Sequence, residues 1–549
     1  MTRYIPLLAA VVALTGICAS AFAKEQKPNL LLILVDDMGY SDLGCYGSEI
    51  PTPHLDALAA GGVRFSAFYN GAQCCPTRAS LISGMYPHEA GVGDMIDAHS
   101  LAVRQAAASP HYSDRLDPRA KTIAEHLRTV GYQTYMTGKW HLGYADGQRP
   151  LQRGFDRYHG IISGADSYFK PRTLREGDTP VDAKILPTGY YTTDAFTAKA
   201  IDFIREGDPA KPFFLYLAYN APHSPFHAPE DEIAKHRGKY DAGFEVIRER
   251  RLAKQKQLGL VPPSTQLPPR DPKSQPWTGS PAQMKEVRNM EIYAAMVTRM
   301  DANVGKLTAF LKERGQLDNT LIVFLSDNGA WASGATYEQE WAETGDTPFR
   351  LFKLFTHEGG IRTPFIAHWP ARIPAGVSQA KQYAHVKDIL PTLLEAASLQ
   401  NKETTRSAAN QRPPLPTVSS SHGLPLSGHS FLPALLDPNQ SKNETLFWER
   451  LGNEAVRDDR WKLVRTYNDI RNYNAQTKRG PGSGQRSGKW ELYDLETDPN
   501  ETRDLATQHP ERVAELSAKH AAWSKRIGVI PREEISQRIS AKETKPTEN

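Results

Sequence analysis

The sequence predicts an α/β protein with a parallel central sheet, together with a smaller C-terminal α+β part that contains an antiparallel sheet. Nearly continuous apolar runs recur along most of the chain, as at 29–35 and 211–217. Such runs are typical of strands buried on both faces of a parallel sheet. Amphipathic helical patterns lie between them. Short β-like runs rich in aromatic residues occur only towards the C-terminus, which favours a small antiparallel sheet there.

Length and charge narrow the possible classes of protein. The 549 residues suffice for one large α/β domain and a smaller one. The 66 basic residues nearly balance the 62 acidic ones. The charge therefore gives no case for a nucleic-acid or membrane-surface partner, and we expect neither.

The N-terminus has the pattern of a secretory signal. Arg3 precedes an apolar run at 5–18, and small residues at 21–23 follow before Lys24. This predicts a cleavable signal peptide over residues 1–23 and an exported protein, periplasmic or secreted. The apolar run is too short for a good transmembrane span, and no other segment approaches one.

The first apolar run ends in two adjacent carboxylates. Asp36 and Asp37 directly follow the strand predicted at 29–35. Buried carboxylates are costly unless they are paired or bind a cation, so the pair favours a site for a hard metal ion. A helix cap is the alternative, but it would use only one aspartate. A helix is then predicted over 54–60, before two glycines.

Three cysteines remain after removal of the signal, namely Cys45, Cys74 and Cys75. This small odd number argues against a disulfide framework and for at least one cysteine with special chemistry. Pro76 favours a helix that opens at this proline and carries Arg78, with its N-terminus directed at a bound anion. Two buried structural cysteines before an ordinary helix are the alternative.

Further polar residues follow predicted strands. Lys139 and His141 come after a strand at 132–136, and His223 comes after the strand at 211–217. Open α/β sheets bind ligands at the carboxyl ends of their strands, so these positions are candidates for a site.

The rest of the chain is predicted as follows. Residues 229–281 are an excursion over the surface, in which the basic run 248–256 is a solvated helical face rather than a polyanion site. A long helix covers 290–311, and a strand at 320–325 precedes Asp327 and Asn328. The remaining predicted elements are a strand at 364–368, a helix at 385–398 and a loop at 400–422. They are followed by short β-runs at 444–449, 462–466 and 490–495, a helix from Pro510 and a loose polar tail from Arg532.

Three stretches of the chain together resemble the motifs of one enzyme family. They are CxPxR at Cys74–Arg78, GKWHxG at 138–143 and EGGxRxP at 358–364. In this order they resemble the formylglycine-dependent sulfatases, and the opening DDMGYSDLGCYGSEIPTPHLDALAAGGVRF is similar to the bacterial arylsulfatase type. Thr77 departs from the serine that is commoner in that motif.

The resemblance implies a fold and an activity. The fold is alkaline-phosphatase-like, with a mixed, mostly parallel sheet flanked by helices. We expect a catalytic domain over 24–425, a C-terminal subdomain over 426–530 and a polar tail over 531–549. The activity is hydrolysis of an aryl or carbohydrate sulfate ester to an alcohol or phenol and inorganic sulfate.

The resemblance also implies roles for individual residues. A maturation enzyme would oxidise Cys74 to formylglycine, whose hydrate supplies an oxygen nucleophile. The implied ligands of one Ca²⁺, with Mg²⁺ less favoured, are Asp36, Asp37, Asp327, Asn328 and the modified Cys74. Oxygen ligands suit these ions better than zinc. Lys139 and Lys353 would contact the sulfate, His141 would take the hydrate proton, His223 would protonate the leaving oxygen, and Arg78 would hold the hydrate and the metal in register.

Three alternative functions remain open. A formylglycine-dependent phosphonate or phosphodiester hydrolase would share Cys74 and the metal ligands. A zinc phosphatase fits less well, because we find neither a second set of Asp and His ligands nor a serine or threonine in the nucleophile position. A non-catalytic protein that binds sulfated glycans would leave the joint presence of Cys74, Lys139, His141 and His223 unexplained.

Overall fold

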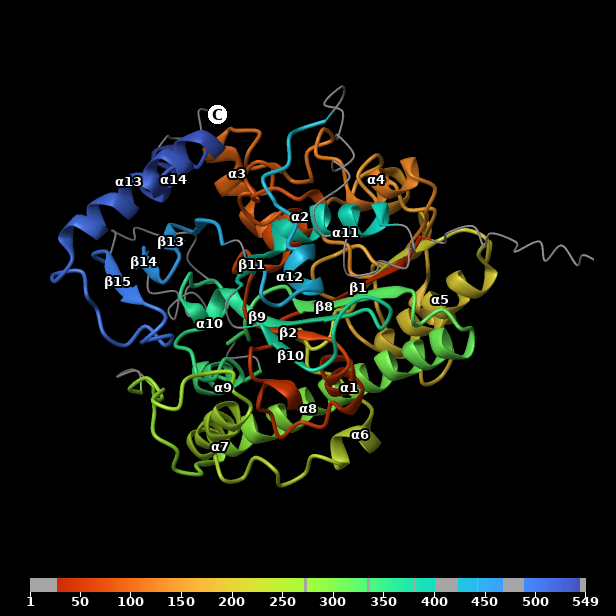
Figure 1. The fold of residues 1–549 in the computed structure, drawn as a ribbon, viewed down its shortest axis with the longest axis horizontal. Coiled ribbons are helices and arrows are strands. Elements are labelled where there is room, and N and C mark those ends of the chain that lie inside the picture. The colour runs from red at the N-terminus through yellow and green to blue at the C-terminus, as the bar shows by residue number, and fades with distance from the viewer. Residues whose placement is uncertain are drawn as a thin grey trace, which may run out of the picture.

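In the computed structural model of the chain, the predicted apolar strands lie in one eleven-stranded sheet (Figure 1). The structure describes residues 27–270, 274–332, 336–379, 382–399, 423–441, 443–467 and 488–543. The predicted signal peptide and the predicted loop at 400–422 lie outside these residues.

The sheet is mixed and mostly parallel at its centre, as predicted. Its strands are β1 (Asn29–Val35), β2 (Val63–Tyr69), β3 (Gln133–Gly138), β4 (Arg157–Ile161), β5 (Leu174–Glu176), β6 (Thr179–Pro180), β7 (Phe213–Ala218), β8 (Thr320–Ser326), β9 (Arg362–His368), β10 (Val377–Gln379) and β11 (Ala384–His385). The order is β10-β2-β9-β8-β1-β7-β3-β4-β5-β6, and β11 also pairs with β2. Strand β9 runs antiparallel to both of its neighbours.

Helices cover both faces of the sheet. One face carries α1 (Pro53–Ala60), α5 (Thr192–Glu206), α6 (Glu230–Ala234), α7 (Phe244–Gln257) and α8 (Pro281–Glu313). The other face carries α2 (Cys74–Ser83), α4 (Ile123–Thr129), α11 (Ile389–Ser398) and α12 (Leu432–Leu436). Helices α3 (Leu101–Ala107), α9 (Gln339–Gly345) and α10 (Glu358–Ile361) lie in the connections.

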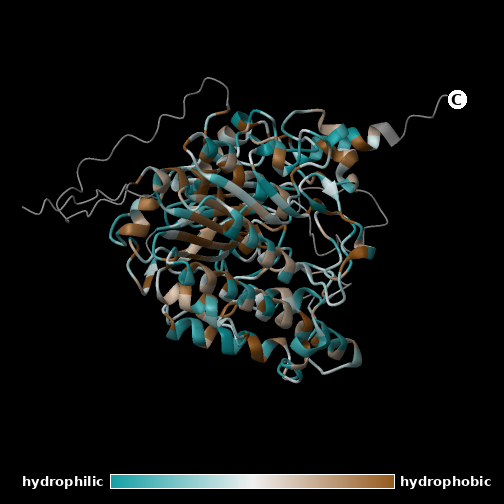
Figure 2. Ribbon diagram, turned by 90° about the vertical axis from the view of Figure 1, so that its right-hand side faces the viewer, coloured by the Kyte–Doolittle hydropathy of each residue, from teal (hydrophilic) through white to brown (hydrophobic). Residues whose placement is uncertain are grey.

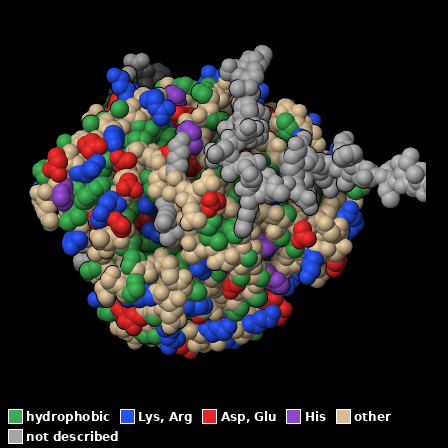
Figure 3. Space-filling model, viewed as in Figure 1, with side chains coloured by type: hydrophobic (Ala, Val, Ile, Leu, Met, Phe, Trp, Pro, Cys, Tyr) green, Lys and Arg blue, Asp and Glu red, His purple; other side chains and the backbone are tan. Residues whose placement is uncertain are grey.

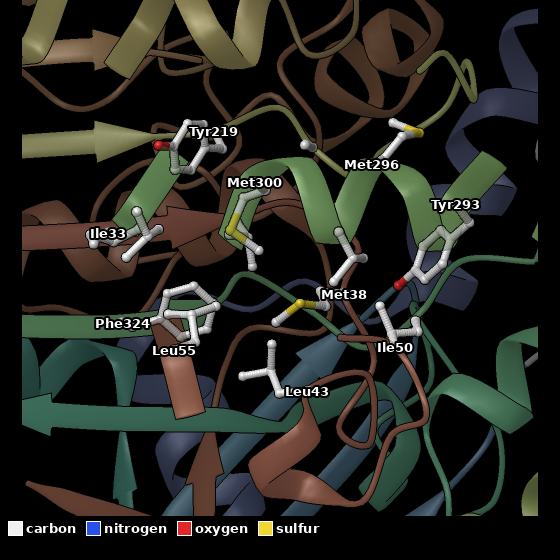
Figure 4. Close-up of a cluster of buried hydrophobic side chains, with 14 of the residues drawn as sticks. Ile33, Met38, Leu43, Ile50, Leu55, Tyr219, Tyr293, Met296, Met300 and Phe324 are labelled. Atoms are coloured by element: carbon white, nitrogen blue, oxygen red, sulfur yellow. The ribbon is translucent and has the colours of Figure 1, made fainter. Parts of the chain in front are cut away.

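Alternate residues of β1 belong to two different cores, which is why its sequence is apolar throughout. Leu31 and Ile33 pack with the core under α8, whereas Leu30 and Leu32 pack with the core under α2. Figure 4 shows the first core, where Met300 of α8 lies near Ile33 and Phe324. Figure 2 shows hydrophobic residues on the interior strands and hydrophilic ones along the outer helices.

The C-terminal part forms a separate antiparallel sheet, as predicted. Its strands, in order, are β12 (Leu446–Arg450), β13 (Asn453–Asp458), β14 (Trp461–Arg465) and β15 (Glu491–Asp494). Helix α13 (Pro510–Ile527) packs against this sheet through Leu516. The sequence did not predict β13, because four of its six residues are polar or charged.

Two local predictions differ from the structure. The tail from Arg532 was predicted to be loose, but helix α14 (Arg532–Glu543) forms there, and its Ile535 and Ile539 pack against α3. The basic run at 248–256 was predicted to be a solvated face, but Arg251 of α7 is fully buried because it is bonded to carboxylates.

The surface carries charges of both signs. On the face drawn in Figure 3, lysine and arginine side chains are interspersed with aspartate and glutamate. None of the helices that the structure describes is long and apolar enough to cross a bilayer.

Candidate active site

Four adjacent strands end in register at one edge of the central sheet. Strand β1 lies between β8 and β7, and β7 also pairs with β3. Val35 pairs with Ser326, and Ala218 pairs with both Leu34 and Gly138. The polar residues that follow these strands therefore meet at the carboxyl edge, where ligands bind in open α/β sheets.

Three oxygen atoms at this edge are buried without a hydrogen-bond donor. They are Oδ1 of Asp36, Oδ2 of Asp37 and Oδ1 of Asn328, and none accepts a hydrogen bond from the described residues. The Asn328 amide donates to the other oxygen of Asp37 at 2.7 Å, which fixes its own oxygen beside the pair. Buried polar atoms nearly always have a hydrogen-bond partner. Three buried oxygens without one, here called orphan oxygens, therefore indicate a site for a ligand.

Arg78 holds the ends of β8 and β3 together. Its Nε and Nη2 donate to Oδ2 of Asp327 at 3.2 and 3.0 Å, and its Nη1 donates to the carbonyl oxygen of Lys139 at 3.1 Å. The second oxygen of Asp327 accepts from the backbone of Asp37 at 3.2 Å. Burial and the charge of Asp36 raise the pKa of Asp327 despite Arg78, so a bound cation would favour its ionised form.

Two buried lysines each face one of the paired aspartates. Nζ of Lys139 lies 2.6 Å from Oδ2 of Asp36, and Nζ of Lys353 lies 2.5 Å from Oδ1 of Asp37. Burial alone would raise the pKa of Asp36, but Lys139 and the other cations hold it well below its usual range. Burial alone would lower the pKa of Lys353, but Asp37, Cys74 and the neighbouring aspartates together outweigh burial and raise it above its usual range.

Cys74 is the first residue of helix α2, so the helix starts two residues before Pro76. Gln73 precedes it in an extended conformation. The hydroxyl of Thr77 accepts a hydrogen bond from the Gly71 backbone at 2.8 Å, which folds the preceding loop onto the helix. Threonine at this position therefore supplies the hydroxyl that organises the loop.

The thiol of Cys74 lies in a positive environment. Burial raises its pKa, but Lys139, Lys353 and His141 outweigh burial and lower the pKa to about 5. Cys45, Cys74 and Cys75, the three cysteines of the described part of the chain, are all free thiols.

The two predicted histidines lie beside the aspartates and Cys74. Nε2 of His141 bonds to Oδ2 of Asp97 at 2.9 Å. Nε2 of His223 lies 3.5 Å from Oδ2 of Asp37, and its Nδ1 donates to the carbonyl oxygen of Ser224 at 2.5 Å. The His223 side chain is 15% exposed, whereas that of His141 is 1% exposed, so His223 is the more open to a substrate.

The donors at this edge fit a divalent cation. Asp36, Asp37 and His223 each offer a ligand atom within 4.8 Å of the other two. With the orphan oxygen of Asn328 the set is rich in oxygen, which suits a hard cation such as Ca²⁺ or Mg²⁺. Both oxygens of Asp327 already accept protein hydrogen bonds, so Asp327 lies in the cluster but is less free than predicted.

Sequence reasoning missed three residues near the site. Asp97 contacts His141, and the hydroxyl of Tyr144 contacts Asp97. The hydroxyl of Tyr168 contacts the carbonyl oxygens of Asn220 and His223 at 2.6 and 2.7 Å. None of the three directly follows a strand, so the pattern that located the other residues did not apply.

Comparisons with known proteins bear on this site. The sulfatase family model matches residues 28–399. The chain is 32% identical to an uncharacterised sulfatase of Schizosaccharomyces pombe over 92% of this chain and 95% of that protein. It is also 32% identical to the arylsulfatase of Klebsiella aerogenes, over 75% of this chain and 94% of that protein. The solved structure of Ps i-CgsB in complex with k-i-k-neocarrahexaose has a TM-score of 0.66 and 26% identity, covering 95% of this chain and 98% of that one.

Proposed function

This chain belongs to the sulfatase family and is a sulfuric ester hydrolase, and we propose that it releases sulfate from an aryl or carbohydrate ester by means of a modified Cys74 and a divalent cation. One observation carries the proposal. Three orphan oxygens lie among lysines and an arginine at the edge where α2 presents Cys74. Such a site can hold both a cation and an anionic ester.

Cys74 is the proposed position of the nucleophile. A formylglycine-generating enzyme would oxidise it, and the hydrated aldehyde would supply an oxygen nucleophile that a thiol cannot. The buried position at the start of a helix and the surrounding lysines support this role, because they stabilise negative charge there.

The cation would be held by Asp36, Asp37 and Asn328, with Asp327 and the modified Cys74 completing the set. The oxygen-rich donors favour Ca²⁺ over Mg²⁺, since Mg²⁺ demands stricter geometry and keeps more of its water. A bound cation would neutralise part of the charge on the sulfuryl oxygens.

The remaining residues act on the substrate and on protons. Lys139 and Lys353 would contact the sulfuryl oxygens from two sides and stabilise the charge that develops there. His223, the more exposed histidine, would donate a proton to the leaving oxygen, and buried His141 would accept one on the Cys74 side. Arg78 would fix the positions of Asp327 and Lys139 through its hydrogen bonds to the Asp327 carboxylate and the Lys139 backbone.

A sulfated glycan is the natural substrate class that we propose. Similarity to Ps i-CgsB, whose solved complex contains k-i-k-neocarrahexaose, supports it. Export by the N-terminal signal would bring the enzyme to such a substrate outside the cytoplasm.

Matched esters test the proposed function. The enzyme, made together with its maturation enzyme, is assayed with 4-nitrophenyl sulfate, phosphate and phenylphosphonate after treatment with EDTA and after addition of Ca²⁺, Mg²⁺ or Zn²⁺. We expect sulfate release to dominate, to disappear with EDTA and to return best with Ca²⁺. Faster turnover of the phosphate or phosphonate ester would favour the phosphonate hydrolase alternative. Tight binding of a sulfated glycan without turnover of any ester would favour a binding protein.

A further inference from the structure

His141 is held by a carboxylate that lies outside the predicted site. Oδ2 of Asp97 lies 2.9 Å from Nε2 of His141, and the side chains are 25% and 1% exposed. Asp97 belongs to the loop before α3, whereas His141 follows β3. The fold therefore brings together two residues that are distant in the sequence.

The charge of Asp97 fixes the tautomer of the neutral His141 ring. Burial would raise the pKa of Asp97, but hydrogen bonds from His141 and Tyr144 hold it well below its usual range. An ionised carboxylate can only accept, so Nε2 of His141 must carry the proton. The other ring nitrogen, Nδ1, is buried and has no hydrogen-bond partner in the described ranges. Its lone pair is thus left free to accept a proton.

The carboxylate is itself held in place. The hydroxyl of Tyr144 donates to the second oxygen of Asp97. Arg104 donates through Nη1 to the backbone carbonyl of Met95 at 2.7 Å and to that of Asp97 at 2.8 Å, which anchors the loop. The carboxylate therefore has little freedom to turn away from His141.

The His141 ring packs tightly against its surroundings. A Cβ atom at Gly164 would lie 2.5 to 3.0 Å from three atoms of the ring, so only glycine leaves room for it. His141 has a positive φ of 55°, which is uncommon for a residue other than glycine. Its backbone N–H donates to Ile162 at 3.2 Å. Strained backbone in a fitted position is typical of functional residues.

We propose that Asp97, supported by Tyr144, is a positioning residue that orients the His141 ring so that Nδ1 accepts a proton on the Cys74 side. The inference rests on the proposed function of His141. Carboxylates that orient a catalytic histidine and select its tautomer are known in other enzymes. Here the same arrangement joins a strand end to a distant loop.

A second buried histidine provides the matched control. Nδ1 of His159 lies 2.5 Å from Oε2 of Glu176, in a pair that bridges β4 and β5. This pair has similar chemistry but does not contact Cys74 or the aspartates. Glu176→Gln therefore reports what the loss of a histidine-carboxylate pair does to the fold alone.

Steady-state kinetics give the first half of the test. Asp97→Asn should lower kcat about 10- to 100-fold at nearly unchanged KM, Tyr144→Phe should lower it less, and Glu176→Gln should leave it unchanged. In a His141→Gln background, Asp97→Asn should cause no further loss, because the two residues act as a unit. A similar loss in both backgrounds would overturn the proposal, since Asp97 would then act independently of His141.

Nitrogen NMR of the full-length chain gives the second half and does not depend on turnover. With ¹⁵N-histidine, and His141 assigned from its absence in His141→Gln, the neutral ring should carry its proton on Nε2 in the wild type. In Asp97→Asn it should become a mixture of tautomers, and in Glu176→Gln it should not change. A proton on Nδ1 in the wild type, or an unchanged spectrum in Asp97→Asn, would overturn the proposal. If the tautomers behave as expected but no sulfate ester is turned over, the positioning role of Asp97 stands and the proposed function fails.

Discussion

Two pairs of carboxylates on the same stretch of chain differ in how many of their oxygens have a hydrogen-bond donor. The first pair is Asp36 and Asp37, and the second is Asp42 and Glu49. Arg251 of α7 donates to both members of the second pair, with Nη1 at 2.6 Å from Asp42 and with Nη2 and Nε at 2.8 and 2.9 Å from Glu49. The hydroxyl of Tyr293 donates to the remaining oxygen of Asp42 at 2.6 Å.

The first pair is the more fully buried, with Asp36 and Asp37 at 0% and 3% exposure against 28% for the Glu49 side chain, but it is not closed, that is, not all of its oxygens accept a hydrogen bond. Lys139 and Lys353 satisfy one oxygen each, whereas Oδ1 of Asp36 and Oδ2 of Asp37 have no hydrogen-bond partner in the part of the chain that is described. Unsatisfied buried oxygens destabilise a protein unless a ligand binds them. Burial and charge alone therefore do not identify a ligand-binding site. Buried oxygens without a hydrogen-bond partner do identify one, so we expect the first pair to bind a ligand and the second pair to stabilise the fold.

The largest effect is expected when the open pair is altered. Asp37→Asn keeps the shape of the side chain but removes a charge that should hold the cation. We expect kcat/KM for a sulfate ester to fall about 10³-fold, because several kcal/mol of charge stabilisation are lost. Saturating Ca²⁺, which should stabilise the wild type by about 2.7 kcal/mol at a hundred times its Kd, should no longer do so.

Asp42→Asn is the matched change in the closed pair. It should leave the Ca²⁺-dependent stabilisation intact. If Asp37→Asn kept that stabilisation and Asp42→Asn lost it, the comparison between the two pairs would be wrong.

A smaller but clear loss of stability is expected when the closed pair is broken. Arg251→Met leaves Asp42 without its cation in the interior, and it removes the partner of the partly exposed Glu49. The free energy of unfolding, measured with urea, should fall by about 3–5 kcal/mol. The activity per folded molecule should change little, because Arg251 contacts none of the groups proposed to act on the substrate.

The neighbouring Arg250 is exposed and provides the control for this change. Arg250→Met should leave the urea midpoint unchanged. Loss of activity in Arg251→Met without loss of stability would contradict the structural role of the closed pair.

The sequence predicted the central sheet because its strands are buried on both faces. A run such as 29–35 has no other simple explanation, and its end located Asp36 and Asp37. The same pattern located Lys139, His223, Asp327 and Asn328, and the register of the strands brought them together.

Contacts between distant loops could not be predicted in this way. Asp97 meets His141 through the tertiary fold, and no local pattern connects them. The basic run on α7 was misread because most charged helical faces are solvated, and its carboxylate partners lie some two hundred residues earlier. Helix α14 was missed because only two of its residues, Ile535 and Ile539, are buried apolar side chains.

Peptide mass spectrometry across Cys74 shows whether this residue is converted to the proposed formylglycine. The protein is made together with a formylglycine-generating enzyme, and Cys75 in the same peptide serves as an internal control. We expect Cys74 to have lost mass by the change from thiol to aldehyde, and Cys75 to remain a thiol. An unmodified Cys74, in cells that modify a known sulfatase, would contradict the proposed role of Cys74 as the nucleophile position.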